Sequence, residues 1–318
     1  MKRRAVLGIG GLAAAAAAVG FPAKQRFDHA VAEARGRIAA PTRLASTRFG
    51  MVQWAEAGHG PPVLMLHGTG GGFDQGLLFA RRLSGAGWRV IAPSRFGYLS
   101  SEFPADPSPA HQADALADLL DALAIDRIPV IGGSAGALSA IEFAIRHPER
   151  CEALVTLVPA AFAPDRPPMR PNALGAAIMR YGLQSDFLFW AGMTLAEGRM
   201  IGTLLATDPA LVQAASPEER ARAGEILRSI LPVSARARGL LNDALHAGNP
   251  TPQELTAIAA PTLAISLEDD RFLTLDAARH IAQTVPGAKL LSYATGGHIW
   301  IGHDAEIFAE IDAYLRQA

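Results

Sequence analysis

The chain has 318 residues, of which 50% are hydrophobic and 19% charged, so it is expected to be globular rather than disordered. Its formal net charge of −1 gives no electrostatic reason to expect nucleic acid as a partner. Cys151 is the single cysteine, which excludes an internal disulfide and a cysteine-rich metal site. Because it stands where a strand is expected to begin, we interpret it as a buried structural thiol.

The first 23 residues resemble a targeting segment. Lys2, Arg3 and Arg4 form a positive cluster, and residues 5–23 follow without charge and are rich in alanine and glycine. The arginine pair is similar to a twin-arginine export signal. We expect export to the periplasm or the medium. An uncleaved anchor that associates with the membrane and a cytoplasmic alanine-rich helix are the alternatives.

The elements that follow alternate between strands and helices. Residues 24–46 are expected to form a surface arm, and residues 47–56 a strand or strand pair. A breaker-rich loop then carries His59, which we interpret as a surface residue. Residues 63–66 are a continuous apolar run, which is typical of a strand buried on both faces of a parallel sheet.

That strand leads into a glycine-rich loop at residues 67–72. Its glycines let the backbone turn sharply and present bare amides, which suits an oxyanion or a phosphate. The phosphate interpretation is weak, because no Gly-Lys-Ser/Thr follows. His67 is expected to shape this loop.

Two helices and one strand are predicted next. A helix is expected over residues 73–83 and a strand over 88–92, followed by a loop that begins at Ser94. Ser108 is a plausible N-cap, with Pro109 at the first helical position. Leucines at positions 116, 119, 120 and 123 give that helix one apolar face.

The pattern G-x-S-x-G occurs at residues 132–136, with Ser134 at its centre. The apolar residues 128–131 before it predict a strand, with Pro129 at its start, and residues 137–146 predict a helix. A sharp strand-to-helix turn exposes the serine, and the helix directs its amide groups at the site where negative charge develops. Alone the five residues are weak evidence, because small residues also form ordinary turns.

Another buried strand is expected at residues 153–158. Residues 161–259 then form too long a stretch for a loop in a compact domain. We interpret it as a helical cap over the sheet, with its apolar bulk supplied by Phe187, Leu188, Phe189, Trp190, Met193 and Met200. The core is expected to occupy residues 47–160 and 260–318.

The last segment alternates again, with strands expected at residues 262–266 and 289–293 and helices at 275–283 and 305–315. The first strand leads into Asp269 and Asp270, and the second into a loop that ends at His298. Because open α/β sheets place their sites at the carboxyl ends of strands, Asp270 and His298 are the candidates for the acid and the base that a serine nucleophile needs. Asp269 is the alternative acid, and His303 is interpreted as a capping or surface residue.

With these residues in place, the chain from about residue 47 onward resembles a capped serine hydrolase of the α/β-hydrolase superfamily. The resemblance implies an α/β-hydrolase fold, with a mostly parallel sheet flanked by helices and a helical cap insertion. It implies that Ser134 attacks, that His298 acts as general base and then acid, and that Asp270 holds the imidazole tautomer. The amides of Thr69 and Ala135 would hold the oxyanion, with Gly70 as the alternative to Thr69.

The chain departs from the family at Ser94, where many relatives carry aspartate. That position is outside the triad, so the change concerns the loop more than the chemistry. A serine nucleophile argues against the haloalkane dehalogenases and epoxide hydrolases of this fold, which use aspartate.

The resemblance implies hydrolysis of an apolar carboxylic ester, a small molecule, with neither cofactor nor metal. Carbon–carbon bond hydrolysis, acyl transfer or cofactor-free perhydrolysis on the same triad are alternatives, and so is a non-catalytic ligand-binding protein on a hydrolase scaffold.

Overall fold

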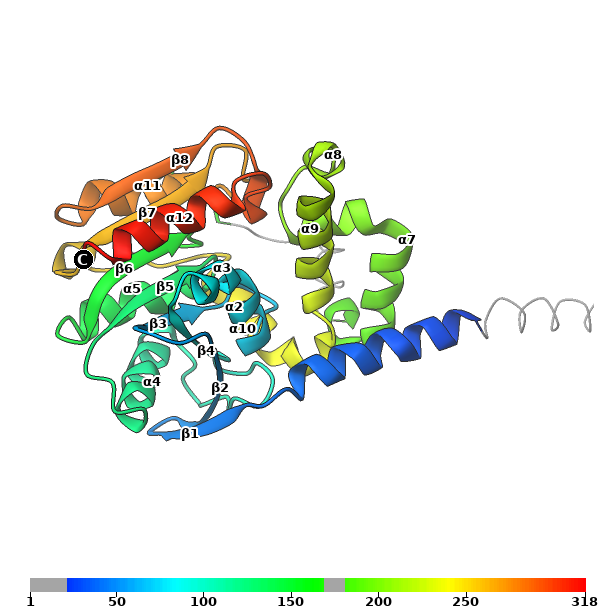
Figure 1. Ribbon diagram of the computed structural model, residues 1–318, viewed down its shortest axis with the longest axis horizontal. Coiled ribbons are helices and arrows are strands. Elements are labelled where there is room, and N and C mark those ends of the chain that lie inside the picture. Colours follow the sequence, from blue (N-terminus) through cyan, green and yellow to red (C-terminus); the bar gives the residue numbers. More distant parts are fainter. Residues whose placement is uncertain (1–21, 169–180) are drawn as a thin grey trace, which may run out of the picture.

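The computed structural model describes residues 22–168 and 181–318. A twisted sheet lies between two layers of helices, and a further group of helices stands to one side of it (Figure 1). The predicted targeting segment lies outside the described residues up to residue 21. Within the described ranges, no helix combines the length and the hydropathy needed to cross a bilayer.

The sheet has eight strands in these residues, in the order β1-β2-β4-β3-β5-β6-β7-β8. The first two pair antiparallel with each other, and β2 also pairs antiparallel with β4; all other pairs are parallel. The fold class predicted from the sequence, a mostly parallel sheet flanked by helices, is therefore confirmed. The strands span Arg43–Thr47, Gly50–Ala57, Pro62–Leu66, Arg89–Pro93, Ile128–Gly133, Cys151–Leu157, Thr262–Leu267 and Lys289–Tyr293, in chain order.

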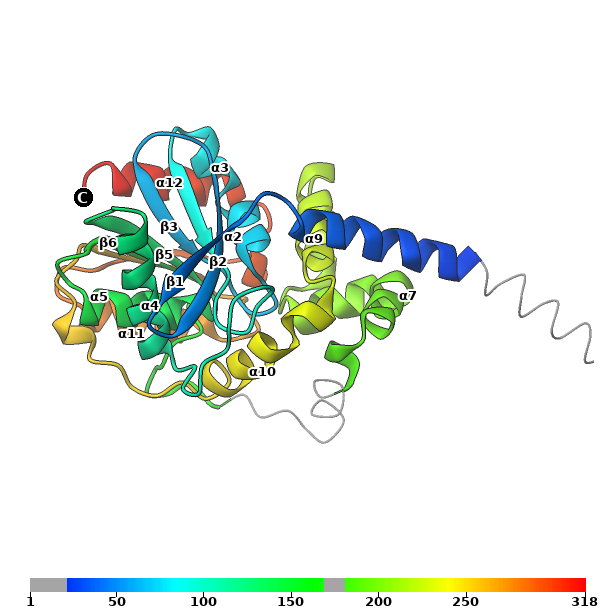
Figure 2. The same ribbon diagram turned by 90° about the horizontal axis from the view of Figure 1, so that it is seen from below.

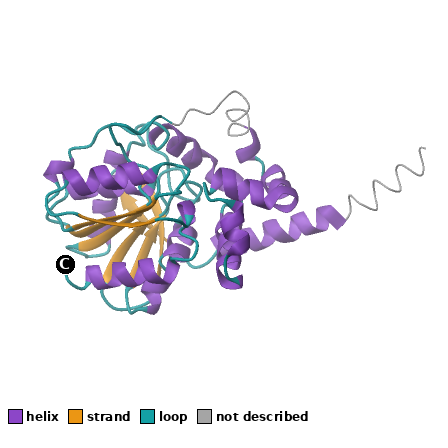
Figure 3. Cartoon of the chain, turned by 90° about the horizontal axis from the view of Figure 1, so that it is seen from above, coloured by secondary structure: helices purple, strands orange, loops and turns teal. Residues whose placement is uncertain are grey.

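The central strands are buried on both faces. In β3, Val63 and Met65 join the hydrophobic cluster on one side, and Leu64 and Leu66 join the cluster on the other. Helices α4 (Pro109–Ala122), α5 (Gly136–Arg146) and α11 (Thr274–Thr284) contribute to the second cluster. On the opposite face lie α3 (Arg81–Gly85) and α12 (Asp304–Leu315), so that the sheet is sandwiched (Figure 3).

Several local predictions hold and others need correction. Ser108 caps α4 through its hydroxyl, which accepts from the amide of His111. The expected helix at 73–83 is two short helices, α2 (Phe73–Phe79) and α3. The sheet begins at Arg43, inside the expected arm. Pro129 is tolerated because the pairing of β5 with β6 shifts register between residues 128 and 130.

Among the described residues between β6 and β7, four α-helices follow one another, namely α7 (Asp186–Leu204), α8 (Pro209–Ala214), α9 (Pro217–Ser229) and α10 (Ala237–His246). We call them the inserted helices. Phe189 is buried there, but Phe187 and Leu188 are exposed, which differs from the expectation that they supply packing bulk. Phe187 still contacts the N-terminal helix, because its ring centroid lies 5.3 Å from that of Phe27.

A helix over residues 22–38 projects from the molecule beside the inserted helices (Figures 1 and 2). Arg37 near its end ties both parts of the molecule together. Its guanidinium donates to Asp74 of α2 at 3.0 Å and to the carbonyl oxygen of Ser229, at the end of α9, at 3.2 Å. Part of the expected surface arm therefore connects the core with the inserted helices through hydrogen bonds.

Candidate active site

The predicted turn at Ser134 lies between β5 and α5. Ser134 has φ of 51°, a left-handed conformation that is unfavourable for a residue with a side chain. A Cβ added to Gly132 would lie 2.7 Å from the Cα of Ala137, and one added to Gly136 would lie 2.5 Å from the carbonyl oxygen of Leu66. Both glycines are therefore required for backbone segments to pass closely enough to hold the turn.

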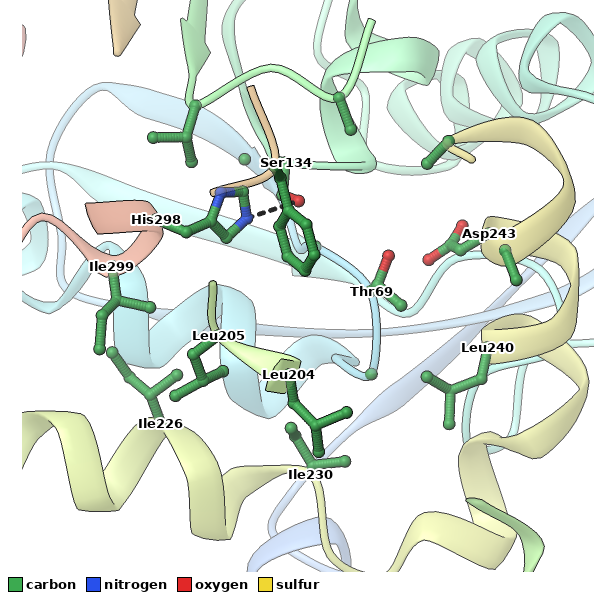
Figure 4. A pocket seen from close by; sticks show the side chains of 18 of the residues that line it. Thr69, Ser134, Leu204, Leu205, Ile226, Ile230, Leu240, Asp243, His298 and Ile299 are labelled. Carbon is green, nitrogen blue, oxygen red and sulfur yellow. Dashed lines mark hydrogen bonds between the residues drawn. The ribbon is translucent and has the colours of Figure 1, made fainter. Parts of the chain in front are cut away.

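The structure brings Ser134, His298 and Asp270 together from three different carboxyl-end loops. His298 Nε2 lies 2.9 Å from Ser134 Oγ (Figure 4). The other ring nitrogen of His298, Nδ1, lies 2.8 Å from Asp270 Oδ2. A carboxylate only accepts hydrogen bonds, so Nδ1 carries the proton and Nε2 is free to accept one from the serine. This is the geometry that a serine nucleophile, a base and an orienting acid require.

Asp270 is held as a carboxylate. Its side chain also accepts hydrogen bonds from the amide of Phe272, at 2.8 Å, and from the hydroxyl of Thr274. Burial alone would raise the pKa of Asp270, but the adjacent His298 ring and these hydrogen bonds outweigh it and lower the pKa. The acid therefore stays ionised and keeps the imidazole in one tautomer.

The alternative residues lie elsewhere. Asp269 accepts hydrogen bonds from the amides of Gly296 and Gly297, at 3.1 and 2.8 Å, so it braces the loop that carries His298. His303 precedes α12 and faces Glu306. His59 is exposed in its loop, and Cys151 is buried at the start of β6, where burial raises the pKa of its thiol to about 12.

The predicted oxyanion amides belong to the two loops that flank Ser134. Among the described residues, no group accepts a hydrogen bond from the amides of Thr69 or Ala135. The amide of Gly70, by contrast, donates to the hydroxyl of Tyr98 at 3.1 Å. Because one amide proton is already used, Thr69 fits the donor role better than Gly70.

His67 shapes this loop as predicted. Its Nδ1 lies 2.7 Å from the carbonyl oxygen of Gly68, and its Nε2 accepts from the amide of Arg95 at 3.0 Å. Burial, together with the charge of Arg95, lowers the pKa of His67 well below its ordinary value. Ser94 also supports the loop, because its hydroxyl accepts from the amide of Phe73 at 3.0 Å.

A cavity of about 600 Å³ opens at Ser134 and His298. The inserted helices and the core both contribute to its largely apolar wall, in which Leu205, Ile226 and Ile299 lie on one side of the serine and Leu240 on the other (Figure 4). Such a wall suits an apolar substrate group. No cluster of three or more His, Cys, Asp or Glu residues is placed to hold a metal in the described part of the chain.

Sequence reasoning missed Tyr98 and Asp243. Tyr98 follows β4, so its place at a carboxyl end could have drawn attention to it. Asp243 lies on α10 and carries no local pattern that links it to the site. Both are buried beside the glycine-rich loop.

Comparison with known proteins agrees with this geometry. Residues 61–302 match the model of the alpha/beta hydrolase fold family. The chain is 31% identical over 274 residues to 2-hydroxymuconate semialdehyde hydrolase of Pseudomonas putida, covering 83% of this chain and 90% of that protein. It is 27% identical to 2-hydroxy-6-oxo-6-phenylhexa-2,4-dienoate hydrolase of Burkholderia cepacia, covering 76% and 83% of the two chains.

A solved structure, the alpha/beta hydrolase fold protein from Nakamurella multipartita, superposes with a TM-score of 0.70 at 26% identity, covering 87% of this chain and 99% of that one. The chain belongs to the alpha/beta hydrolase fold family, and it is a hydrolase.

Proposed function

We propose that the protein is a serine hydrolase that cleaves carboxylic esters with an apolar acyl part. The observation that carries the proposal is the continuous hydrogen-bonded chain from Ser134 through His298 to Asp270. In this mechanism His298 takes the serine proton as Oγ attacks the ester carbonyl carbon. His298 then gives that proton to the departing alcohol, which leaves an acyl-serine that water hydrolyses.

The amides of Thr69 and Ala135 stabilise the negative oxygen of each tetrahedral intermediate in this proposal. Ala135 stands at the N-terminus of α5, where the helix dipole also favours negative charge. The inserted helices act as a cap that covers the acyl group, since α7, α9 and α10 all contribute to the cavity wall.

Carbon–carbon bond hydrolysis is the second candidate, and the curated relatives favour it. The Burkholderia cepacia relative is named for a 6-oxo-dienoate, which has a 6-oxo carbonyl and a carboxylate, and the Pseudomonas putida relative is named for a muconate semialdehyde. An anionic substrate needs a cationic partner in an apolar cavity. Among the described residues that line the cavity, Arg166 is the one arginine or lysine, and it could supply that charge.

A labelling experiment tests the nucleophile that both candidates share. The purified full chain is treated with a fluorophosphonate, and the modified peptide is identified by mass spectrometry. We expect one adduct on Ser134, lost in Ser134→Ala, greatly slowed in His298→Ala and unchanged in Ser139→Ala, which alters a buried serine of the same turn-and-helix segment. A folded protein without the adduct would contradict the triad.

Product analysis separates the two candidates. Turnover is measured on p-nitrophenyl esters of increasing acyl length and on a 2-hydroxy-6-oxo-dienoate. Ester cleavage with kcat/KM at least ~10-fold higher supports the ester proposal, since that ratio is about 1.4 kcal/mol of transition-state binding. The reverse order, accompanied by loss of dienoate turnover in Arg166→Met, supports carbon–carbon hydrolysis.

A further inference from the structure

Tyr98 joins the glycine-rich loop to an inserted helix. Its hydroxyl accepts a hydrogen bond from the amide of Gly70 at 3.1 Å and donates to Asp243 Oδ2 at 2.5 Å. Tyr98 is 1% exposed, and Asp243 is 3% exposed. A hydroxyl has one proton to give, so these two contacts use it in a single arrangement, with the amide as donor and the carboxylate as acceptor.

Arg95 belongs to the same hydrogen-bonded network as Tyr98 and Asp243. It pairs with both oxygens of Asp243, at 2.7 and 2.5 Å, and it donates to the carbonyl oxygens of His67 and Gly68 at 3.0 and 3.2 Å. A planar guanidinium that donates to a carboxylate in this two-pronged way has a defined orientation. The buried charges of Arg95 and Asp243 therefore compensate each other, and the remaining N–H groups of Arg95 donate to the glycine-rich loop.

Thr69 lies between the two held points. The carbonyl of Gly68 on one side is held by Arg95, and the amide of Gly70 on the other side is held by Tyr98. The Gly68 carbonyl and the Thr69 N–H belong to the same planar peptide group, so the contact with Arg95 orients the proposed oxyanion donor directly. The contact with Tyr98 fixes the peptide group that follows. In Figure 4, Thr69 stands between Ser134 and Asp243.

We propose that Tyr98 and Asp243 are positioning residues that hold the Thr69 amide on the reacting carbonyl, so that α10 of the insertion completes the oxyanion site. The inference rests on the proposed serine mechanism. Neither side chain needs to touch the substrate's reacting atoms, because each acts through the loop. An oxyanion donor must be aimed at the negative oxygen of the transition state, so its misalignment reduces kcat more than it weakens substrate binding.

The proposal is tested by comparing the kinetic constants of two variants that each lose one tyrosine hydroxyl, Tyr98→Phe and Tyr314→Phe. Tyr98→Phe keeps the ring and removes only the hydroxyl that accepts from Gly70. We expect kcat on the best ester to fall at least ~10-fold, with KM within ~3-fold of wild type. Tyr314→Phe, which removes a hydroxyl on the remote helix α12, is the matched control and is expected to leave both constants unchanged.

A transition-state analogue gives a readout that a merely structural role would not move. With a trifluoromethyl ketone, Ser134 Oγ bonds to the ketone carbon, the carbonyl electron pair moves to oxygen and His298 takes the serine proton. We expect its inhibition constant to rise in Tyr98→Phe by the same factor as kcat/KM falls. The inhibition constant of the matching methyl ketone should stay within ~2-fold, because it binds largely without forming the oxyanion.

Asp243→Asn keeps the test informative if Tyr98→Phe folds poorly. The amide keeps the size of the side chain but weakens the contacts with Tyr98 and Arg95, so an intermediate loss of kcat is expected, with the same proportional loss of trifluoromethyl ketone affinity. Unchanged kcat and unchanged affinity in both folded variants would overturn the positioning role. Failure of wild-type Ser134 to react with a fluorophosphonate would instead overturn the serine mechanism.

Discussion

Two neighbouring aspartates, Asp269 and Asp270, have different hydrogen-bond partners although they differ by only one position in the chain. Asp270 turns toward His298 Nδ1, while Asp269 turns toward the amides of Gly296 and Gly297. Both follow β7 and both are carboxylates, so their chemistry is the same and only their direction differs. Asp269 shapes the loop that presents His298, and Asp270 faces the ring itself.

The two positions should therefore respond differently to the same substitution. Asp270→Asn is expected to lower kcat by about 10³–10⁴-fold with little change in folding, because the amide favours the wrong imidazole tautomer. Asp269→Asn should lower the free energy of unfolding by about 1–3 kcal/mol, since one backbone amide loses its acceptor, while kcat stays within ~10-fold. Ester kinetics and urea unfolding of both variants check this, and equal losses of kcat would contradict the assignment.

At the scale of elements, the strand–turn–helix at Ser134 depends on close packing of backbone against backbone. The positive φ of Ser134 is strained, and it persists because β5 and α5 hold both ends of the turn. The turn also places Ala135 at the helix N-terminus. A strained serine and an amide-rich helix start therefore arise from the same local arrangement.

Three glycines in this turn provide an internal comparison. Gly132→Ala and Gly136→Ala are expected to lower the free energy of unfolding by ~1–3 kcal/mol or more, because their new methyl groups would meet backbone atoms at 2.7 and 2.5 Å. Gly133→Ala should cost less than ~0.5 kcal/mol, since its nearest neighbour would be the end of the Met65 side chain at 3.6 Å. Urea unfolding measures all three, and equal losses would refute the packing argument.

At the scale of the whole molecule, one edge of the sheet gathers residues from distant parts of the chain. Parallel strands β3, β5, β7 and β8 point the same way, so the loops after them meet, and α10 closes over them. The same convergence buries His67 completely beneath the glycine-rich loop. A buried neutral histidine makes the stability of the whole fold depend on pH.

The direction of that dependence follows from the lowered pKa of His67. In the unfolded chain the imidazole has an ordinary pKa of 6.5, whereas burial and the charge of Arg95 lower it well below that value in the folded protein. Below pH 6.5 the unfolded state therefore binds a proton that the folded state does not. The stabilisation is fully present above pH 6.5 and is lost as pH falls toward the folded-state value, by up to about 1.4 kcal/mol per pH unit.

Urea unfolding between pH 7.5 and 5 tests this linkage. His67→Gln should be less stable at pH 7.5, because hydrogen bonds in the loop are lost, but its stability should change less steeply below pH 6.5. His59→Gln, in an exposed loop, should keep the wild-type slope. Parallel pH curves for wild type and His67→Gln would show that His67 does not carry the effect.

Local patterns were enough to predict the sheet class, most strands, the turn at Ser134 and the residues that now lie within hydrogen-bonding distance of one another. Apolar runs, caps and glycines act over a few residues, so the chain displays them directly. The sequence already favoured Asp270 over Asp269, but the direction of each carboxylate required the tertiary structure. So did the use of the Gly70 amide by Tyr98 and the arrival of Asp243 from α10. Those contacts join residues far apart in the chain, and their direction depends on how the strands, loops and inserted helices pack together.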